Sequence, residues 1–171
     1  MVKLDKIYTR GGDNGKTSLG NGQRVSKHSL RVMSYGDIDE VNTVIGILIN
    51  HCSNDLKKNL GIIQNDLFDI GADLCMPDAS NKKKLKLNPE QVCFLEREID
   101  LMNKSLDDLK SFVLPGGTLA SCYLHFARCV VRRSERSLSN LNEYESVNQE
   151  VLKYVNRLSD FFLLQLDMKI E

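Results

Sequence analysis

A run of arginines in the second half of the chain is the feature best suited to binding an anion. Arg128, Arg132 and Arg136 recur at four-residue steps, with His125 one turn before them and Glu135 at the edge of the same helical face. Guanidinium groups at this spacing repel one another unless carboxylates or an anionic ligand lie opposite, and arginine suits bidentate contact with phosphate. The alternative is a solvated helix face neutralised by acidic neighbours. The clustering favours a polyanion site.

A glycine-rich segment near the N-terminus offers a second way to bind phosphate. It reads TRGGDNGKTSLG from residue 9 to residue 20. Glycines let successive backbone N–H groups converge on an anion, and Lys16, Thr17 and Ser18 add side-chain donors. The spacing is not that of a P-loop, because Arg10 stands where the first glycine of that motif is required. The segment is therefore either a phosphate-binding loop of another kind or a flexible arm.

Other polar groups give weaker signals. Asn156 and Asp160 share a face of the last expected helix. Asp39 and Glu40 stand near the start of another, where they favour the helix dipole or pair with the arginines. The histidines lack the E-x-x-H spacing of di-iron bundles, and no nucleophile-elbow motif occurs. These residues add no nucleophile or metal centre to the two candidate phosphate sites.

The remainder of the chain is patterned to place these groups on helices. Apolar residues recur at three- and four-residue steps, as in Leu56, Leu60 and Ile63. The sequence Asn-Pro-Glu-Gln beginning at Asn88 predicts a capped helix start. Short connections favour antiparallel neighbours, which predicts an all-α, five-helix up-and-down bundle of the ferritin-like kind with few strand signals. The predicted helices span about 37–52, 55–76, 89–107, 116–141 and 145–169.

Length and composition predict one domain, with residues 1–36 as a glycine-rich arm and residues 37–171 as the bundle. The 23 basic and 23 acidic residues give zero net charge, which argues against a dedicated nucleic-acid binder or a polybasic membrane-surface protein. No apolar run suits a membrane span or a signal peptide, so we expect a cytoplasmic protein. The cysteines form no C-x-x-C pair and are expected to be reduced and mostly buried, with Cys122 and Cys129 in the core.

Four segments, taken together in order, resemble the PduO-type corrinoid (ATP:cob(I)alamin) adenosyltransferases. The segments are residues 7–19, residues 35–42, residues 112–117 together with 125–136, and residues 156–160. The resemblance implies a homotrimer with ATP and the corrinoid bound between adjacent subunits. It implies transfer of the 5′-deoxyadenosyl group of ATP to cob(I)alamin, which yields adenosylcobalamin and triphosphate. Reduced cobalt is then the nucleophile, in agreement with the missing protein nucleophile.

The resemblance also implies roles for individual residues. Asp39 and Arg128 match a pair that forms an intersubunit salt bridge lining the corrinoid site. Phe112 matches an aromatic residue on the lower face of cobalt, where displacing the lower ligand eases reduction of cob(II)alamin. With Arg132, these three form the expected catalytic set. The residues that match the ATP site are Thr9, Arg10, Gly11, Gly12, Thr17, Ser18, Lys27, Arg132, Arg133, Glu135, Arg136 and Asn156.

Other implied components lie outside the chain. Mg²⁺ is expected mainly through the ATP phosphates, with no dedicated protein ligands. A flavoprotein reductase and an adenosylcobalamin-dependent acceptor enzyme are the implied partners. Three positions depart from the family pattern: Gly11 replaces a common Thr, His28-Ser29 replaces a commonly acidic pair, and Ser134 replaces a usual Ala. Two alternatives remain, a non-catalytic bundle that holds or delivers the cofactor and, more weakly, an ATP hydrolase.

Overall fold

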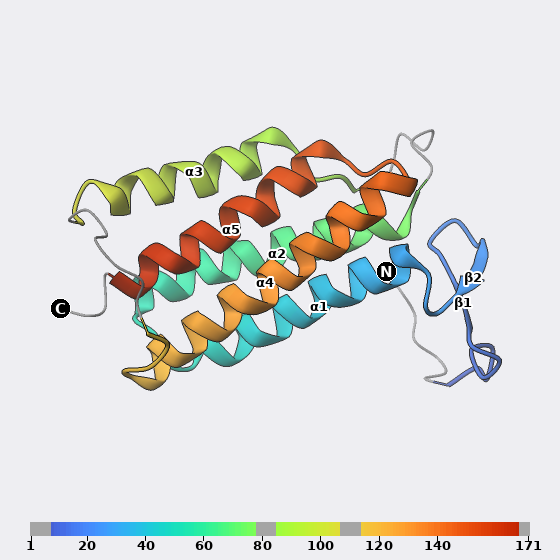
Figure 1. The fold of residues 1–171 in the computed structure, drawn as a ribbon, viewed down its shortest axis with the longest axis horizontal. Helices are drawn as coiled ribbons and strands as arrows, with labels where there is room; N and C mark the ends of the chain where they lie inside the picture. Colours follow the sequence, from blue (N-terminus) through green and yellow to red (C-terminus); the bar gives the residue numbers. More distant parts are fainter. Residues whose placement is uncertain (1–7, 78–84, 107–113, 168–171) are drawn as a thin grey trace.

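Five helices account for most of the described chain and confirm the all-α prediction (Figure 1). The computed structural model describes residues 8–77, 85–106 and 114–167. The helices are α1 (Leu30–Ile49), α2 (Asn54–Cys75), α3 (Pro89–Asn103), α4 (Leu119–Tyr144) and α5 (Gln149–Asp167).

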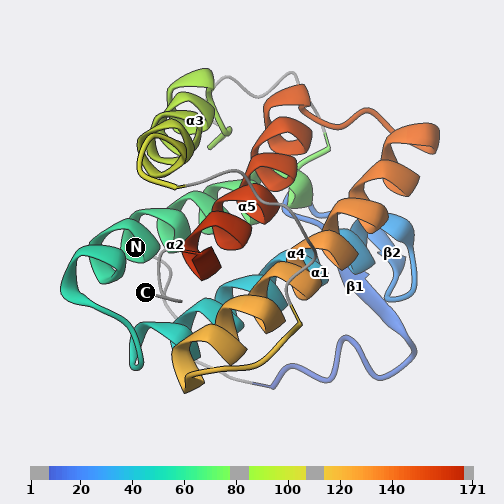
Figure 2. The same cartoon turned by 60° about the vertical axis from the view of Figure 1, so that its left-hand side comes forward.

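The core lies among α1, α2, α4 and α5, and α3 covers one side of α5 (Figures 1 and 2). α1 packs against α2 and α4, and α5 packs against α4 and α3. The predicted apolar stripe of the second helix is confirmed, because Leu60, Ile63 and Ile70 are fully buried. α5 contributes the largest buried side chains, Tyr154, Phe161 and Phe162. Aromatic burial on this scale makes α5 the central element of the bundle.

α1 begins at Leu30, well before the predicted start at residue 37. The early turns were missed because their buried positions are polar: Arg31 is 4% exposed and Ser34 is fully buried. These two residues continue the core-facing row that Ile38 and Ile45 occupy further along the helix. The boundary between arm and bundle consequently lies near Leu30, within the segment assigned to the arm.

The arm contains a small hairpin that the sequence analysis did not predict. Strands β1 (Lys16–Ser18) and β2 (Arg24–Ser26) pair antiparallel, and each is too short to show an alternating pattern. The Gly20 N–H donates to the Cys75 carbonyl oxygen at 2.8 Å, which tethers the hairpin to the end of α2. A Cβ at Gly20 would stand 2.5 Å from the Met76 sulfur, so any other residue here would force the Met76 side chain to move.

The predicted capping box at the start of α3 is confirmed and reaches into the core. The Asn88 side chain accepts from the Gln91 N–H, and the Gln91 side chain accepts from the Asn88 N–H. Gln91 Nε2 also donates to Asp66 at 2.6 Å and to Asp69 at 3.1 Å. Tyr154 donates its hydroxyl to Asp66 at 2.8 Å, and burial raises the pKa of Asp66. One buried carboxyl group thus joins α2, α3 and α5.

The expectation that the cysteines are mostly buried is wrong. Cys93, Cys122 and Cys129 are exposed, and Cys52 and Cys75 are half-buried. On α4 the core-facing row passes instead through residues such as Leu124 and Leu138. None of the described helices is long and apolar enough to cross a membrane.

Candidate functional site

The arginines of α4 divide between two neighbouring helices. Arg133 turns toward α1, where it forms an ion pair with Glu40. This pair neutralises Arg133, which lies outside the stripe of Arg128, Arg132 and Arg136. Arg128 and Arg132 influence Asp160 of α5, since their charges lower its pKa. Burial has the larger effect and raises the pKa of Asp160. Two predicted site arginines therefore lie near enough to α5 for their charges to act on Asp160.

Asn156 of α5 lies at the centre of this α4–α5 face. Its Nδ2 donates to Glu135 Oε1 at 2.8 Å, which joins two residues that the sequence analysis placed in one site. Its Oδ1 accepts from Arg157 Nη1 at 2.6 Å. Arg132 and Arg136, one on each side of Glu135 in sequence, are both exposed. We define the ATP face, named for the ligand expected there, as Arg132, Glu135, Arg136 and Asn156.

Nearer the start of α4, two polar atoms are buried without a hydrogen-bond partner in the described part of the chain. They are His125 Nε2 and Arg128 Nε. Burial lowers the pKa of His125, and the nearby Arg128 charge lowers it further, so the imidazole is neutral near pH 7. Buried polar atoms are normally paired, so this end of α4 has unmet hydrogen-bonding capacity within one chain.

Asp39 is exposed and lines a mainly apolar groove between α1 and α2. The groove has a volume of about 450 Å³ and is also lined by Tyr35, Ile38, Leu67 and Phe68. Phe68 is 68% exposed, an unusual position for a large apolar side chain. Among the described residues, no ion pair joins Asp39 to Arg128. A single chain therefore does not form the expected pair.

The hairpin arm is held by a residue that the sequence analysis missed. Arg24 donates to the Gly11 carbonyl oxygen and, at 3.2 Å, to Ser18 Oγ. The signal would have been a hairpin register that places Arg24 opposite Ser18. Lys27 lies against Gly12, where a Cβ would stand 3.0 Å from the ammonium nitrogen. Gly12 and Lys27, both expected at the phosphates, are thus adjacent.

The expected ATP site has two parts, the arm and the ATP face, which lie on different elements of the chain. The hairpin lies beyond the start of α1 in both views (Figures 1 and 2) and is tethered to α2. Within the described ranges, no hydrogen bond or ion pair joins arm residues such as Thr9, Arg10 and Thr17 to Arg132 or Arg136. Phe112 lies outside the described residues, so its role stays a prediction.

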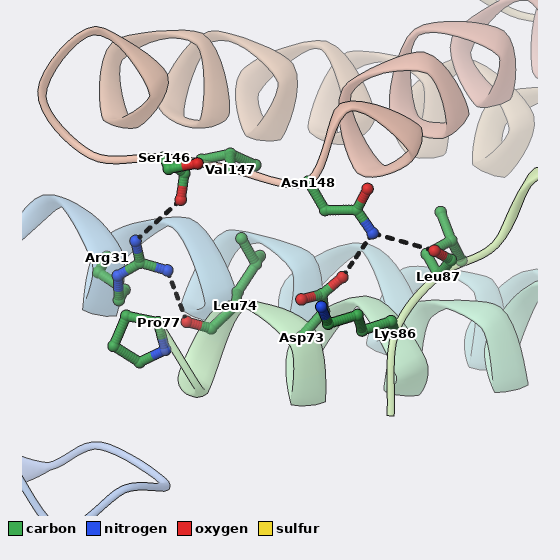
Figure 3. Close-up of a pocket in the computed structure, with 9 residues that line it drawn as sticks. All are labelled: Arg31, Asp73, Leu74, Pro77, Lys86, Leu87, Ser146, Val147 and Asn148. Atoms are coloured by element: carbon green, nitrogen blue, oxygen red, sulfur yellow. Dashed lines mark hydrogen bonds between the residues drawn. The ribbon is translucent and has the colours of Figure 1, made fainter. Parts of the chain in front are cut away.

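A polar pocket of about 290 Å³ lies between the end of α2 and the turn that joins α4 to α5 (Figure 3). Arg31 donates there to Glu145 at 2.7 Å and to the Leu74 carbonyl oxygen at 2.9 Å. Asn148 donates to Asp73 at 2.7 Å and to the Leu87 carbonyl oxygen at 2.9 Å. The Arg31 and Asn148 side chains thus connect the end of α2 to the turn between α4 and α5, which indicates that this pocket has a structural role.

Comparisons with known proteins identify what the chain is similar to. A family model described as cobalamin adenosyltransferase matches residues 7–166. The corrinoid adenosyltransferase of Bacillus subtilis is 44% identical over 162 residues, covering 92% of this chain and 82% of that protein. The corrinoid adenosyltransferase of Mycobacterium tuberculosis is 44% identical over 169 residues, covering 95% of this chain and 88% of that protein.

Solved structures give the same picture. A variant PduO-type ATP:corrinoid adenosyltransferase from Lactobacillus reuteri, complexed with cobalamin and ATP, superposes with a TM-score of 0.89. It is 37% identical, and the match covers 95% of this chain and 92% of that one. A second variant from the same organism, complexed with ATP, has a TM-score of 0.87 at 36% identity and covers 95% of this chain and 93% of that one.

Proposed function

Because this chain belongs to the cobalamin adenosyltransferase family, we propose that the ATP face of α4 and α5 holds the triphosphate during adenosyl transfer. The protein is an ATP:corrinoid adenosyltransferase, a transferase that adenosylates a corrinoid at the expense of ATP. The observation that carries the site is the pairing of Asn156 with Glu135 beside the exposed Arg132 and Arg136. This arrangement offers cationic donors and a fixed amide on one surface.

The chemistry asks these residues to position and stabilise charge. Co(I) of cob(I)alamin attacks C5′ of ATP, a cobalt–carbon bond forms, and the C5′–O bond breaks. Its electron pair leaves with the triphosphate. Arg132 and Arg136 stabilise the negative charge that grows on the leaving oxygen. No proton has to be removed from the nucleophile, so the site needs no general base.

The corrinoid is proposed to lie against the groove between α1 and α2. The apolar walls formed by Ile38, Leu67 and Phe68 suit the face of a large macrocycle, and Asp39 supplies a carboxylate at the edge. Phe112 belongs to this proposal as the residue at the lower face of cobalt. Its expected role is to exclude a lower ligand, which favours reduction of cob(II)alamin before transfer.

Mg²⁺ is proposed to bind mainly through phosphate oxygens. The part of the chain that the structure describes holds no group of three or more His, Cys, Asp or Glu side chains suited to a metal. Mg²⁺ usually keeps several waters and binds through substrate phosphates with few protein ligands, so the triphosphate oxygens would supply most of its coordination. When bound, the ion neutralises phosphate charge. The arginines supply the remaining positive charge.

We further propose a homotrimer in which each site draws on two subunits. Within the described ranges, no ion pair engages Asp39, and Arg128 Nε has no hydrogen-bond partner. Both observations support an intersubunit ion pair between the two residues. Among the residues that the structure describes, no hydrogen bond or ion pair joins the arm to the ATP face. This supports an arm that reaches a neighbouring subunit, where Arg10, Gly12, Thr17, Ser18 and Lys27 would contact phosphate. A cytoplasmic location, a flavoprotein reductase and an acceptor enzyme complete the proposal.

The activity has a direct test that separates the alternatives. Incubation with ATP, Mg²⁺ and chemically reduced cobalamin is expected to give a light-sensitive adenosylcobalamin spectrum and one triphosphate per product. A binding module would bind both substrates without turnover. An ATP hydrolase would release phosphate and ADP instead of triphosphate. Either outcome would contradict the stated function, and omission of reductant provides the control.

Charge reversal tests the intersubunit pair. Asp39→Arg places like charges opposite each other, so we expect the trimer to dissociate at concentrations where the unmodified protein stays assembled. Combining Asp39→Arg with Arg128→Asp restores opposite charges and is expected to restore the trimer mass in sedimentation equilibrium. Glu40→Arg is the matched control, since Glu40 already pairs with Arg133 in its own chain. If the trimer persists in Asp39→Arg alone and in Arg128→Asp alone, the pair is ruled out.

A further inference from the structure

We propose that Glu96 of α3 and Arg157 of α5 are positioning residues that set the orientation of the Asn156 amide toward ATP. This inference rests on the proposed placement of ATP on the α4–α5 face. None of the residues matched to the ATP site lies on α3. The proposal therefore adds a helix outside the α4–α5 face to the residues that shape that site. The juxtaposition is a continuous chain of hydrogen bonds that crosses α3, α5 and α4.

The chain of contacts is short and unbroken. Glu96 Oε1 accepts from Arg157 Nε at 3.1 Å. Arg157 Nη1 donates to Asn156 Oδ1 at 2.6 Å, and Asn156 Nδ2 donates to Glu135 Oε1 at 2.8 Å. Glu135 stands between Arg132 and Arg136 on α4, so the chain ends inside the ATP face. The carboxylate on α3 thus reaches the proposed nucleotide site through two side chains.

The chemistry of the end groups permits only one orientation of the amide. A guanidinium can only donate, so the Asn156 atom that faces Arg157 must be the oxygen. An ionised carboxylate can only accept, so the atom that faces Glu135 must be the nitrogen. A flipped amide would break both bonds. It would place the amide NH₂ against the Arg157 donor and the amide oxygen against the Glu135 acceptor. Asn156 Nδ2 carries a second N–H, which has no acceptor within the described ranges and is therefore free for a nucleotide.

Arg157 can hold the Asn156 amide oxygen in place only while the plane of its own guanidinium group is fixed. Its Nε and Nη1 point to different partners, so the rigid fork of the guanidinium transmits the position of Glu96 to Asn156. The side chains of Arg157 and Glu96 are 37% and 44% exposed, so solvent competes for each of them separately. Without Glu96, Arg157 gains rotational freedom and the amide loses its fixed partner. Lysine offers one nitrogen and cannot bridge both groups.

The test measures steady-state kinetics of the full-length enzyme with saturating cob(I)alamin and varied ATP. Glu96→Ala is expected to raise the KM for ATP about three- to tenfold, the range of one net hydrogen bond, and to leave kcat nearly unchanged. Glu96→Gln keeps an acceptor oxygen and is expected to recover most of the affinity. Arg157→Lys is expected to behave like Glu96→Ala, although it keeps the charge. A purely structural role would lower kcat and thermal stability together.

Two further variants separate this inference from the proposed site. Glu98→Ala is the matched control, because Glu98 lies on the same helix but bonds to Asn59 of α2; its KM for ATP should not change. In an Asn156→Ala background, Glu96→Ala should have no additional effect. An unchanged KM in Asn156→Ala alone would refute the placement of ATP. A raised KM in Asn156→Ala with a normal KM in Glu96→Ala, or equal losses in both backgrounds, would overturn the positioning role.

Discussion

Replacing Arg132 by alanine should lower kcat/KM for ATP by about 10- to 150-fold. A hydrogen bond to a charged group contributes about 1.5–3 kcal/mol, and the loss converts to this factor in the rate constant. Arg132 is exposed on the ATP face, and within the described ranges its side chain forms no ion pair. The guanidinium is therefore available for phosphate. Part of the effect is expected in kcat, because negative charge on triphosphate increases in the transition state.

Two comparisons make this prediction specific. Arg132→Lys keeps the positive charge but loses the planar fork, so its activity should lie between those of the alanine variant and the unmodified enzyme. Arg97→Ala removes an exposed arginine from α3, where it lies over the Phe94 ring, and should leave both kinetic constants unchanged. Equal activity of Arg132→Ala and Arg97→Ala would show that the triphosphate does not bind on this face.

Replacing Arg31 by alanine should lower the free energy of unfolding by about 3 kcal/mol. The side chain is 5% exposed and donates to Glu145, to the Leu74 carbonyl oxygen and, at 3.4 Å, to the Ser146 carbonyl oxygen. Alanine leaves these acceptors without their partner in a buried place, where breaking a paired charge costs about 3–5 kcal/mol. The lower end applies because Glu145 is 43% exposed and can be solvated.

Urea unfolding at constant ionic strength measures this loss, and the midpoint of thermal unfolding should fall by about 6–12 °C. Lys58→Ala is the control, since Lys58 forms an exposed pair with Asp55 and its loss should cost less than about 0.5 kcal/mol. Arg31→Lys should remain destabilised, because one ammonium group cannot reach the carbonyl oxygens of Leu74 and Ser146 (Figure 3) together with the Glu145 carboxylate. A loss within 0.5 kcal/mol for Arg31→Ala would contradict the structural role of this pocket.

The sequence was informative wherever apolar residues carry the helical period. The stripe through Leu60 and Ile63 predicted α2 within a residue or two, and the polar tetrad beginning at Asn88 predicted the capping box at the start of α3. The prediction failed for the first turns of α1, since Arg31 and Ser34 occupy core-facing positions there. Polar burial depends on partners from distant elements, and one sequence does not reveal them.

The candidate site shows the same limit. The four-residue spacing of Arg128 and Arg132 placed them on one helical face, and the charges of both act on Asp160 of α5. Arg133 follows directly in sequence but turns to Glu40 of α1. The proposed positioning role of Arg157 could not be predicted from the sequence. It depends on α3 lying beside α5 with the Glu96 carboxylate within hydrogen-bond distance of Arg157. Pairing between helices, rather than periodicity within one, decides such roles.

The position of α3 has a consequence for the native-state fluctuations of the enzyme. Among the described residues, α3 packs extensively against α5 and is joined to α2 by the side-chain hydrogen bonds of Gln91 and Glu98. It can therefore separate from the bundle by breaking one large interface and these few bonds. Such an opening would be a sub-global unfolding event of lower free energy than unfolding of the central helices. It would also remove Glu96 from Arg157 and release the Asn156 amide. Nucleotide affinity and the local stability of an outlying helix are thereby thermodynamically linked, and bound ATP should slow amide hydrogen exchange in α3.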